Sequence, residues 1–112
     1  MKVLEKQTFW STAENKVIER ERLLNLEFLG EKNNIQFYKI FFSDASSNIE
    51  GELTINFENL TIAYSKQINT EFKKDIIFLS ELNYNKNDNK WQGFSFKVDI
   101  PENNYCELSF IE

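Results

Sequence analysis

The chain has 112 residues, 18 acidic and 13 basic side chains, a net charge of −5 and no histidine. The lack of histidine excludes Ser–His–Asp and Cys–His catalysis, and a single cysteine excludes both an intrachain disulfide and a cysteine-based metal site. The glycines Gly30, Gly51 and Gly93 lie too far apart for a phosphate-binding loop. We therefore expect one non-enzymatic domain over residues 1–112, without metal or cofactor, and the aromatic content of 15% supplies its core.

The first third of the chain carries conflicting signals. Residues 2–10 read as a strand, and the sequence Ser-Thr-Ala-Glu at 11–14 has the form of a helix capping box. Good helix formers follow, but apolar residues at 24, 26 and 28 alternate with polar ones, as they do in a strand. We expect a short helix or turn near 12–20 and a strand over 22–29.

The middle of the chain has a simpler strand pattern. A hairpin loop at 30–34 leads into residues 35–42, which are apolar at both parities and so predict a central strand buried on both faces. Residues 49–57 alternate between apolar and polar side chains, and a further short strand is expected over 60–64.

A change of period marks the segment from residue 65. Apolar residues recur at spacings of three and four, at Ile68, Phe72, Ile76, Leu79 and Leu82. This spacing predicts an amphipathic helix of about four turns over 66–84. The alternative interpretation is a buried strand over 75–84 that pairs with 91–100 across the Asn-rich loop 85–90.

Residues 91–110 read as two alternating strands joined by a Pro-Glu-Asn-Asn turn, with Phe94 and Phe96 on the apolar parity of the first. Together these elements predict an α+β, β-rich fold, an antiparallel sheet of five to seven strands with one or two helices packed on it. An all-β sandwich or barrel is the alternative. The sequence shows no signal peptide and no apolar run near the ~18 residues of a spanning helix, so we expect a cytoplasmic protein without membrane contact.

The charges are unevenly spread. Residues 40–65 and 98–112 contain no Lys or Arg. If their strands share one side of the sheet, their acids form one negative surface that favours a basic protein partner and opposes nucleic acid. The candidate partner-binding residues are the acids Asp44, Glu50, Glu52, Glu58, Asp99, Glu102 and Glu107 and the aromatic anchors Tyr64, Trp91 and Tyr105.

The domain is small, acidic and rich in Asn, Lys and Ile, and it ends with the pattern W-x-x-F-x-F-x-V followed by Tyr105, Leu108 and Phe110. In these features it resembles the immunity proteins of bacterial polymorphic toxin and contact-dependent inhibition systems. The resemblance implies a cytoplasmic protein that neutralises a cognate basic toxin, often a nuclease, by covering its active site. It assigns no role to any single residue. The alternative is a small β-rich module, monomeric or homodimeric, that holds an apolar or sugar ligand among its aromatics or serves as a structural unit.

Overall fold

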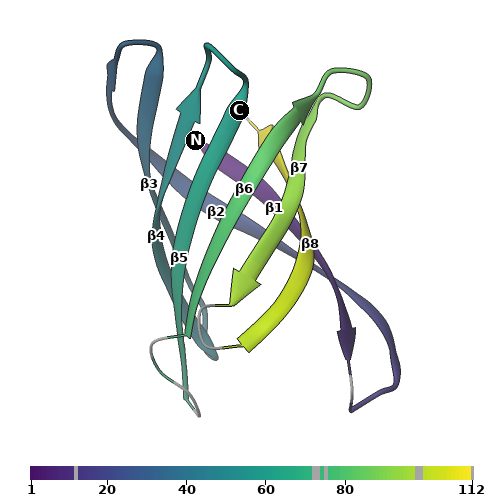
Figure 1. Cartoon of the computed structure of the whole chain (residues 1–112). Coiled ribbons are helices and arrows are strands. Elements are labelled where there is room, and N and C mark those ends of the chain that lie inside the picture. Colours follow the sequence, from purple (N-terminus) through teal and green to yellow (C-terminus); the bar gives the residue numbers. More distant parts are fainter. Residues whose placement is uncertain (12, 72–73, 75, 98–99, 112) are drawn as a thin grey trace.

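Eight antiparallel strands close into a barrel in the computed structural model, which describes residues 1–11, 13–71, 74, 76–97 and 100–111 (Figure 1). Each strand pairs with the next along the chain, and β8 pairs with β1 to complete the ring. The strands are β1 (Lys2–Ser11), β2 (Lys16–Lys32), β3 (Ile35–Ser43), β4 (Ser47–Asn56), β5 (Thr61–Thr70), β6 (Ile76–Asn85), β7 (Lys90–Lys97) and β8 (Ile100–Ile111).

The expected α+β architecture is wrong, because the described residues contain no helix, and the all-β barrel alternative is the one that the structure has. The helix predicted over 66–84 is instead β5 and β6. Of its apolar residues, Ile68 and Leu82 are buried in the barrel whereas Leu79 points outward, and Phe72 lies outside the described residues. The strand alternative is correct, since β6 pairs with β7 with Tyr84 opposite Trp91. Backbone pairing on both sides of each strand outweighs a local period of three and four.

The helix or turn predicted near 12–20 is the hairpin between β1 and β2, in which Trp10 lies opposite Val17. One half of the capping box does form, because the hydroxyl of Ser11 accepts a hydrogen bond from the Glu14 amide at 3.3 Å. The chain then turns back through Asn15, whose φ of 54° is left-handed. The same polar side chain therefore supports a tight turn as readily as a helix start.

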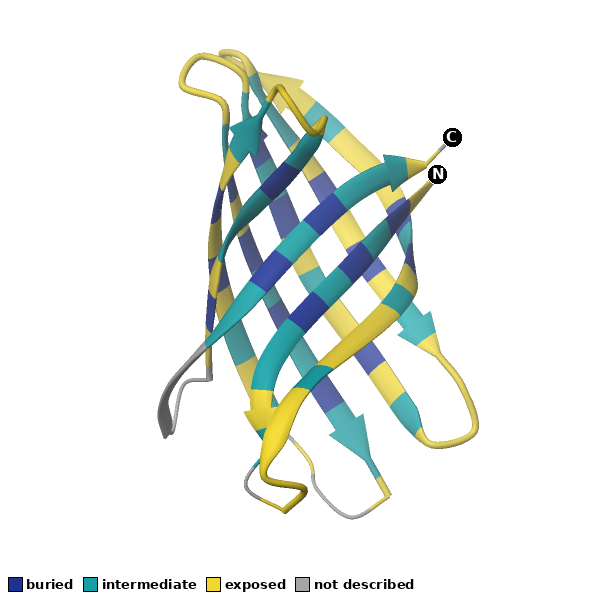
Figure 2. Ribbon diagram, turned by 90° about the vertical axis from the view of Figure 1, so that its right-hand side faces the viewer, coloured by how far each residue is buried: buried dark blue, intermediate teal, exposed yellow. Residues whose placement is uncertain are grey.

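Other turns and strands differ from expectation in detail. The hairpin loop predicted at 30–34 is confined to Asn33 and Asn34, whose φ values of 52° and 65° suit a two-residue turn between twisted strands. Strand β3 was expected to be buried on both faces, but Phe37 and Phe41 point outward and are about two-fifths exposed (39% and 41%). A closed barrel buries only the inner side of each strand, so β3 has one solvated side (Figure 2).

The core lies inside the barrel, and buried positions alternate with more exposed ones along the strands (Figure 2). Its buried apolar residues come from all eight strands and are Val3, Leu24, Leu26, Tyr38, Ile40, Ile49, Leu53, Ile55, Ile62, Tyr64, Ile68, Leu82, Trp91, Cys106 and Leu108. Gly51 and Gly93 occupy inward positions where neighbouring backbone approaches closely. A Cβ atom at Gly51 would lie 2.1 Å from the carbonyl oxygen of Ser65, and one at Gly93 would lie 2.1 Å from that of Glu81. Glycine at these two positions lets the strands bend as the barrel closes.

An ion pair crosses the interior. Lys66 Nζ on β5 lies 2.8 and 2.7 Å from the two carboxylate oxygens of Glu5 on β1, and the Tyr64 hydroxyl donates to the same carboxylate at 2.5 Å. Lys66 and Glu5 are 2% and 1% exposed, so both charges are removed from water. Strands β1 and β5 lie on opposite walls of the barrel, so this contact joins the two walls directly.

We expect Lys66→Met to lower the free energy of unfolding by about 3–5 kcal/mol, because it leaves the Glu5 carboxylate buried without its cation. The double variant Glu5→Gln, Lys66→Met should recover most of this loss, since it buries no charge and leaves Tyr64 an acceptor. Urea unfolding followed by circular dichroism measures both. As a control, Lys6→Met removes only an exposed ion pair with Glu19 and should change stability by less than about 1 kcal/mol. A double variant as unstable as Lys66→Met would contradict the prediction.

Candidate functional site

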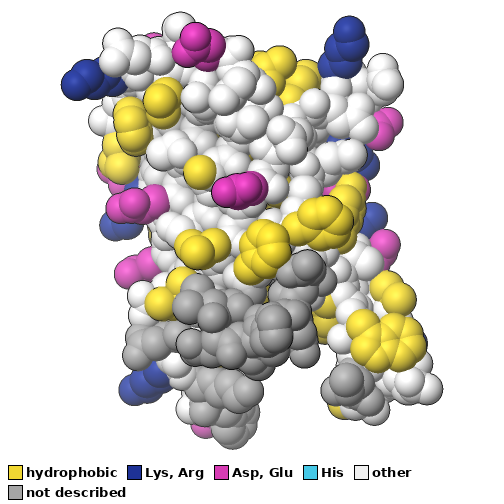
Figure 3. Space-filling view, viewed as in Figure 1, with side chains coloured by type: hydrophobic (Ala, Val, Ile, Leu, Met, Phe, Trp, Pro, Cys, Tyr) yellow, Lys and Arg dark blue, Asp and Glu magenta, His cyan; other side chains and the backbone are white. Residues whose placement is uncertain are grey.

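The outer face of β6 and β7 is apolar where a solvated barrel wall is expected to be polar. Leu79 lies directly opposite Phe96, and Phe94 is one position further along the same outer row. These three side chains are 50%, 44% and 56% exposed, and Ile77 beside Leu79 is 40% exposed. Figure 3 shows hydrophobic side chains gathered across this face of the molecule. Contiguous exposed apolar side chains of this kind mark binding surfaces.

Behind Phe94 and Phe96, the inner side of the same two strands carries a pair of small polar residues. Ser80 and Ser95 are buried there and joined by a hydrogen bond of 2.8 Å between their hydroxyl oxygens. The sequence predicted that the phenylalanines of β7 face the core. The structure has them on the outside, and the polar Ser95 between them is buried. The apolar parity of Phe94 and Phe96 is the outer one, so both residues are available for contact.

A groove with a volume of about 730 Å³ lies on this outer face and extends towards the hairpin between β6 and β7. Its lining residues are Glu81, Asn83, Tyr84, Asn85, Lys86, Gln92, Gly93, Phe94, Phe96 and Tyr105. The rings of Phe94 and Tyr105 meet edge to face, with centroids 6.4 Å apart and an interplanar angle of 78°. The groove therefore combines exposed aromatic rings with side-chain amides and two charged groups.

Hydrogen bonds on β7 and β8 hold the polar side of the groove in place. The Tyr105 hydroxyl lies 2.9 Å from Glu107 Oε1 and 3.2 Å from Gln92 Oε1, and Lys90 Nζ donates to Glu107 Oε2 at 3.2 Å. Partial burial would raise the pKa of Glu107, but the hydrogen bonds from Tyr105 and Lys90 outweigh it and lower that pKa below its usual value. Burial and the bond to Glu107 raise the pKa of Tyr105 to about 12. Near neutral pH, Glu107 is thus a fixed carboxylate and Tyr105 a fixed neutral donor.

A second, smaller cavity of about 260 Å³ lies at the barrel end that carries both chain termini. Its walls are Met1, Gln36, Tyr38, Ile55, Phe57, Trp91, Phe110 and Ile111. The Tyr38 hydroxyl donates to Gln36 at 2.6 Å, and Trp91 packs on Tyr84 with ring centroids 5.0 Å apart. The volume of this cavity falls below the usual range for a ligand site.

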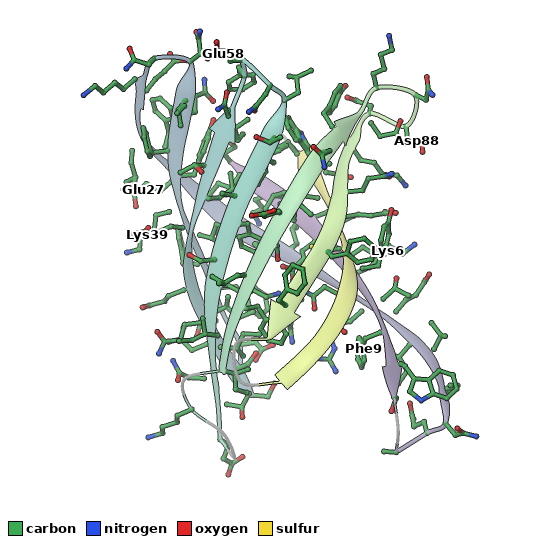
Figure 4. All side chains as sticks on the ribbon, viewed as in Figure 1. Lys6, Phe9, Glu27, Lys39, Glu58 and Asp88 are labelled. Carbon is green, nitrogen blue, oxygen red and sulfur yellow. The ribbon has the colours of Figure 1, made fainter. Side chains whose placement is uncertain are left out.

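The acidic residues predicted to form one docking face lie apart. Glu50 and Glu52 are on β4 and Glu107 is on β8, and three strands separate β4 from β8 in either direction around the ring. Asp44 and Glu58 lie in turns at opposite ends of β4 (Figure 4 labels Glu58). The two base-free segments therefore occupy opposite walls and do not form one surface. Asp99 lies outside the described residues, and Glu102 is in β8 but its side chain is outside what the structure describes.

The three predicted aromatic anchors also separate. Tyr64 and Trp91 are 3% and 7% exposed and belong to the interior, so neither can contact a partner on the outer wall. Tyr105 lies in the groove. Phe94, Phe96 and the amide residues of the groove were missed as site residues, because an alternating pattern does not reveal which of its two faces is buried.

Other kinds of site find less support in the described part of the chain. It contains no group of three or more acidic or sulfur ligands that could hold a metal ion. Burial raises the pKa of the Cys106 thiol to about 12, which leaves it protonated and unreactive. Among these residues no helix is long and apolar enough to cross a membrane.

Comparison with protein-family models, with curated proteins and with solved structures gives no match to this chain. The features that bear on function are therefore the geometry of the groove and the charges of the barrel wall.

The outward orientation of Phe94 can be tested by stability. We expect Phe94→Thr to change the free energy of unfolding by less than about 1 kcal/mol, because a β-branched residue replaces an exposed one on the strand. Leu108→Ala, at a fully buried position on the neighbouring strand, should lower it by about 2–5 kcal/mol. Equal losses for the two variants, measured by urea unfolding, would show that Phe94 packs in the core.

Proposed function

We propose that this chain is a non-enzymatic binding protein that takes a neutral, polyhydroxylated ring ligand, such as a saccharide, in the outer groove of β6, β7 and β8. The observation that carries the proposal is the pair of exposed rings Phe94 and Phe96 beside convergent side-chain amides. This matches the sequence-based alternative of a sugar ligand among aromatics more closely than it matches one acidic docking face.

The chemistry of the groove suits such a ligand in two ways. The C–H face of a sugar ring is apolar and can lie on the exposed aromatic rings, which gain by leaving water. Side-chain amides carry both donors and an acceptor, as vicinal hydroxyls do, and Asn83 and Gln92 border the rings. Glu81 lies opposite Phe94 in the ladder and adds an acceptor for hydroxyl protons.

The groove is also organised before any ligand arrives. Its rings and amides stand mainly on strands of a closed barrel, and the bonds from Tyr105 and Lys90 to Glu107 fix its β8 side. A ligand therefore meets few side chains that it must order, which reduces the entropic cost of binding.

A titration with soluble hexasaccharides of glucose, xylose, mannose and N-acetylglucosamine tests the proposal, with ¹H–¹⁵N spectra and calorimetry as readouts. We expect saturable shifts of groove residues for at least one sugar. Phe94→Thr and Gln92→Ala should each weaken that binding by about tenfold, or about 1.4 kcal/mol.

Phe41→Thr is the matched control, since Phe41 is an outward, similarly exposed phenylalanine on β3, away from the groove. It should bind like the unaltered chain. The proposal is overturned if no hexasaccharide shifts the groove residues, or if Phe94→Thr binds as well as the control.

A second candidate is the neutralisation of a basic protein toxin, now restricted to one wall of the barrel. Glu27, Lys39 and Glu52 lie opposite one another across β2, β3 and β4, and Glu50 is the next outward residue on β4. Figure 4 shows Glu27 and Lys39 pointing outward from this wall. Three acids around one lysine, none in an ion pair within the described chain, favour a cationic partner.

For this second candidate, Glu50→Lys with Glu52→Lys should slow association with a basic nuclease toxin domain at least tenfold and flatten its salt dependence. Surface plasmon resonance against a panel of such domains, at low and moderate salt, gives both quantities. Glu14→Lys reverses a charge in the exposed turn between β1 and β2, away from the β4 wall, and should leave association unchanged. If both variants behave alike, the β4 wall is not the docking surface.

A further inference from the structure

Three side chains that carry hydrogen-bond donors, Gln7, Arg20 and Arg22, lie on the inner-facing side of the hairpin formed by β1 and β2. Gln7 lies opposite Arg20 in the ladder, and Arg22 follows one inward position further along β2, opposite Glu5. All of these residues share the inward parity of the buried Val3 and Leu24. The hairpin thus presents an amide and two guanidinium groups to one region of the barrel.

The amide of Gln7 is the most unusual of the three. The residue is 92% buried (8% exposed), and its Nε2 has no acceptor at hydrogen-bonding distance and angle in the described chain. It does interact with the Cys106 thiol, whose pKa it lowers, but sulfur is a weak acceptor. A buried donor that leaves water without gaining an acceptor is destabilising, and nearly all such groups in folded proteins are satisfied. An oxygen supplied from outside the chain would satisfy this one.

The two arginines likewise lack carboxylate partners within 4 Å in the described chain. Glu5 is near Arg22, but both of its oxygens are held by Lys66 and Tyr64. Asp44 also acts on the charge of Arg22, but it forms no ion pair within 4 Å in the described chain, and its Oδ1 accepts from the serines at 46 and 47.

The surroundings of Arg22 carry a positive excess. Arg20, Arg22 and Lys66 face the two carboxylates of Glu5 and Asp44. Burial, and after it the like charge of Arg20, lower the pKa of the Arg22 guanidinium. An anion between the two guanidinium groups would relieve their repulsion.

The end of the hairpin leaves this cluster accessible. Strand β1 pairs with β8 only from Lys2 to Thr8, and β2 pairs with β3 only from Asn25 onward. Beyond these points the hairpin extends away from the rest of the barrel, as Figure 1 shows. Arg20 is exposed, and its guanidinium carbon lies over the Phe9 ring, 5.5 Å from the centroid.

We propose that Gln7, Arg20 and Arg22 form a binding site for an oxyanion, in the first place a carboxylate carried on an apolar body. A guanidinium binds a carboxylate or a phosphate through two parallel N–H bonds, and the Gln7 amide would supply a further donor. Phe9 and Ile18 would contact the apolar body, because they lie opposite each other on the same inner face and are only partly buried. This site is separate from the groove of β6, β7 and β8 and goes beyond the function proposed for it.

Sodium octanoate, 1-octanol and inorganic phosphate are the probes that separate the possible sources of binding. Octanoate should shift the Nε–H resonances of Arg20 and Arg22 and the side-chain amide of Gln7 in ¹H–¹⁵N spectra, in a saturable manner. Octanol should leave these resonances unmoved. Saturable shifts with phosphate would assign the site to oxyanions generally, whereas shifts with octanoate alone would assign it to carboxylates with an apolar tail.

Variants test the assignment by residue. Arg22→Gln should weaken octanoate binding at least tenfold, and Arg22→Lys, which keeps the charge but not the planar fork, should weaken it less. Gln7→Leu should also weaken binding while leaving the chain at least as stable, since it removes an unsatisfied donor; a purely structural role predicts the opposite pattern. Lys39→Gln, on the outer wall, should bind normally, and far-ultraviolet circular dichroism confirms that each variant is folded.

Three results would overturn the proposal. One is no saturable shift with either octanoate or phosphate. Another is octanol binding as well as octanoate, which would show that the anion is irrelevant. The last is folded Arg22→Gln and Gln7→Leu variants that both bind octanoate like the unaltered chain.

Discussion

The contact between Lys66 and Glu5 constrains the whole barrel. An eight-stranded ring encloses a space that side chains can just fill, so a charge pointing inward must find its partner inside. Lys66 reaches across from β5 to Glu5 on β1, and the Tyr64 hydroxyl donates a further hydrogen bond to the same carboxylate. The ammonium group of Lys66 also lies 5.3 Å from the centroid of the Phe78 ring. A one-residue slip of β5 would turn Lys66 out to solvent and leave Glu5 buried without its cation. The pair thus penalises alternative registers of strands that are distant in sequence, which is a stronger role than any contribution it makes to net stability.

Local patterns predicted several strands and missed the closure. The strands expected over 2–10, 35–42 and 49–57 match β1, β3 and β4 to within a few residues, because alternation and Asn-rich turns are encoded locally. The pairing of β1 with β8 joins the two ends of the chain, and no short window carries that information. The helix prediction for 66–84 was wrong for a different reason. Apolar residues spaced three and four apart fit one face of a helix, but they also fit a strand that carries apolar residues on its outer face. Only the ladders on either side decide between them.

The candidate site was harder to predict than the fold. Phe94, Ser95 and Phe96 form an alternation that is equally regular whichever side is buried, and core burial of the phenylalanines is the ordinary expectation. In the barrel the inward positions of this stretch are taken by Gly93 and by Ser95, which bonds to Ser80, and a side chain at position 93 would meet the backbone of β6. Phe94 and Phe96, on the other parity, therefore stand outside. Of the aromatic anchors expected from sequence, Tyr105 alone lies on this surface. Trp91 is buried because the barrel closes around it, and no local pattern in the sequence predicts that closure.

The small polar residues inside β6 and β7 and the apolar residues on the outer face of these strands are two sides of one alternation. Small and polar residues at inward positions, such as Ser80, Ser95 and Gly93, leave room for the side chains that reach across the barrel and allow the strands to bend. Phe94 and Phe96, at the alternate positions of β7, stand outside, where they line a groove held by a closed ring of hydrogen-bonded strands. A surface of this origin is rigid, because its rings stand on strands paired on both sides rather than on loops. A binding site requires a rigid surface with exposed apolar area, whereas a barrel wall that only faces water is expected to carry polar side chains.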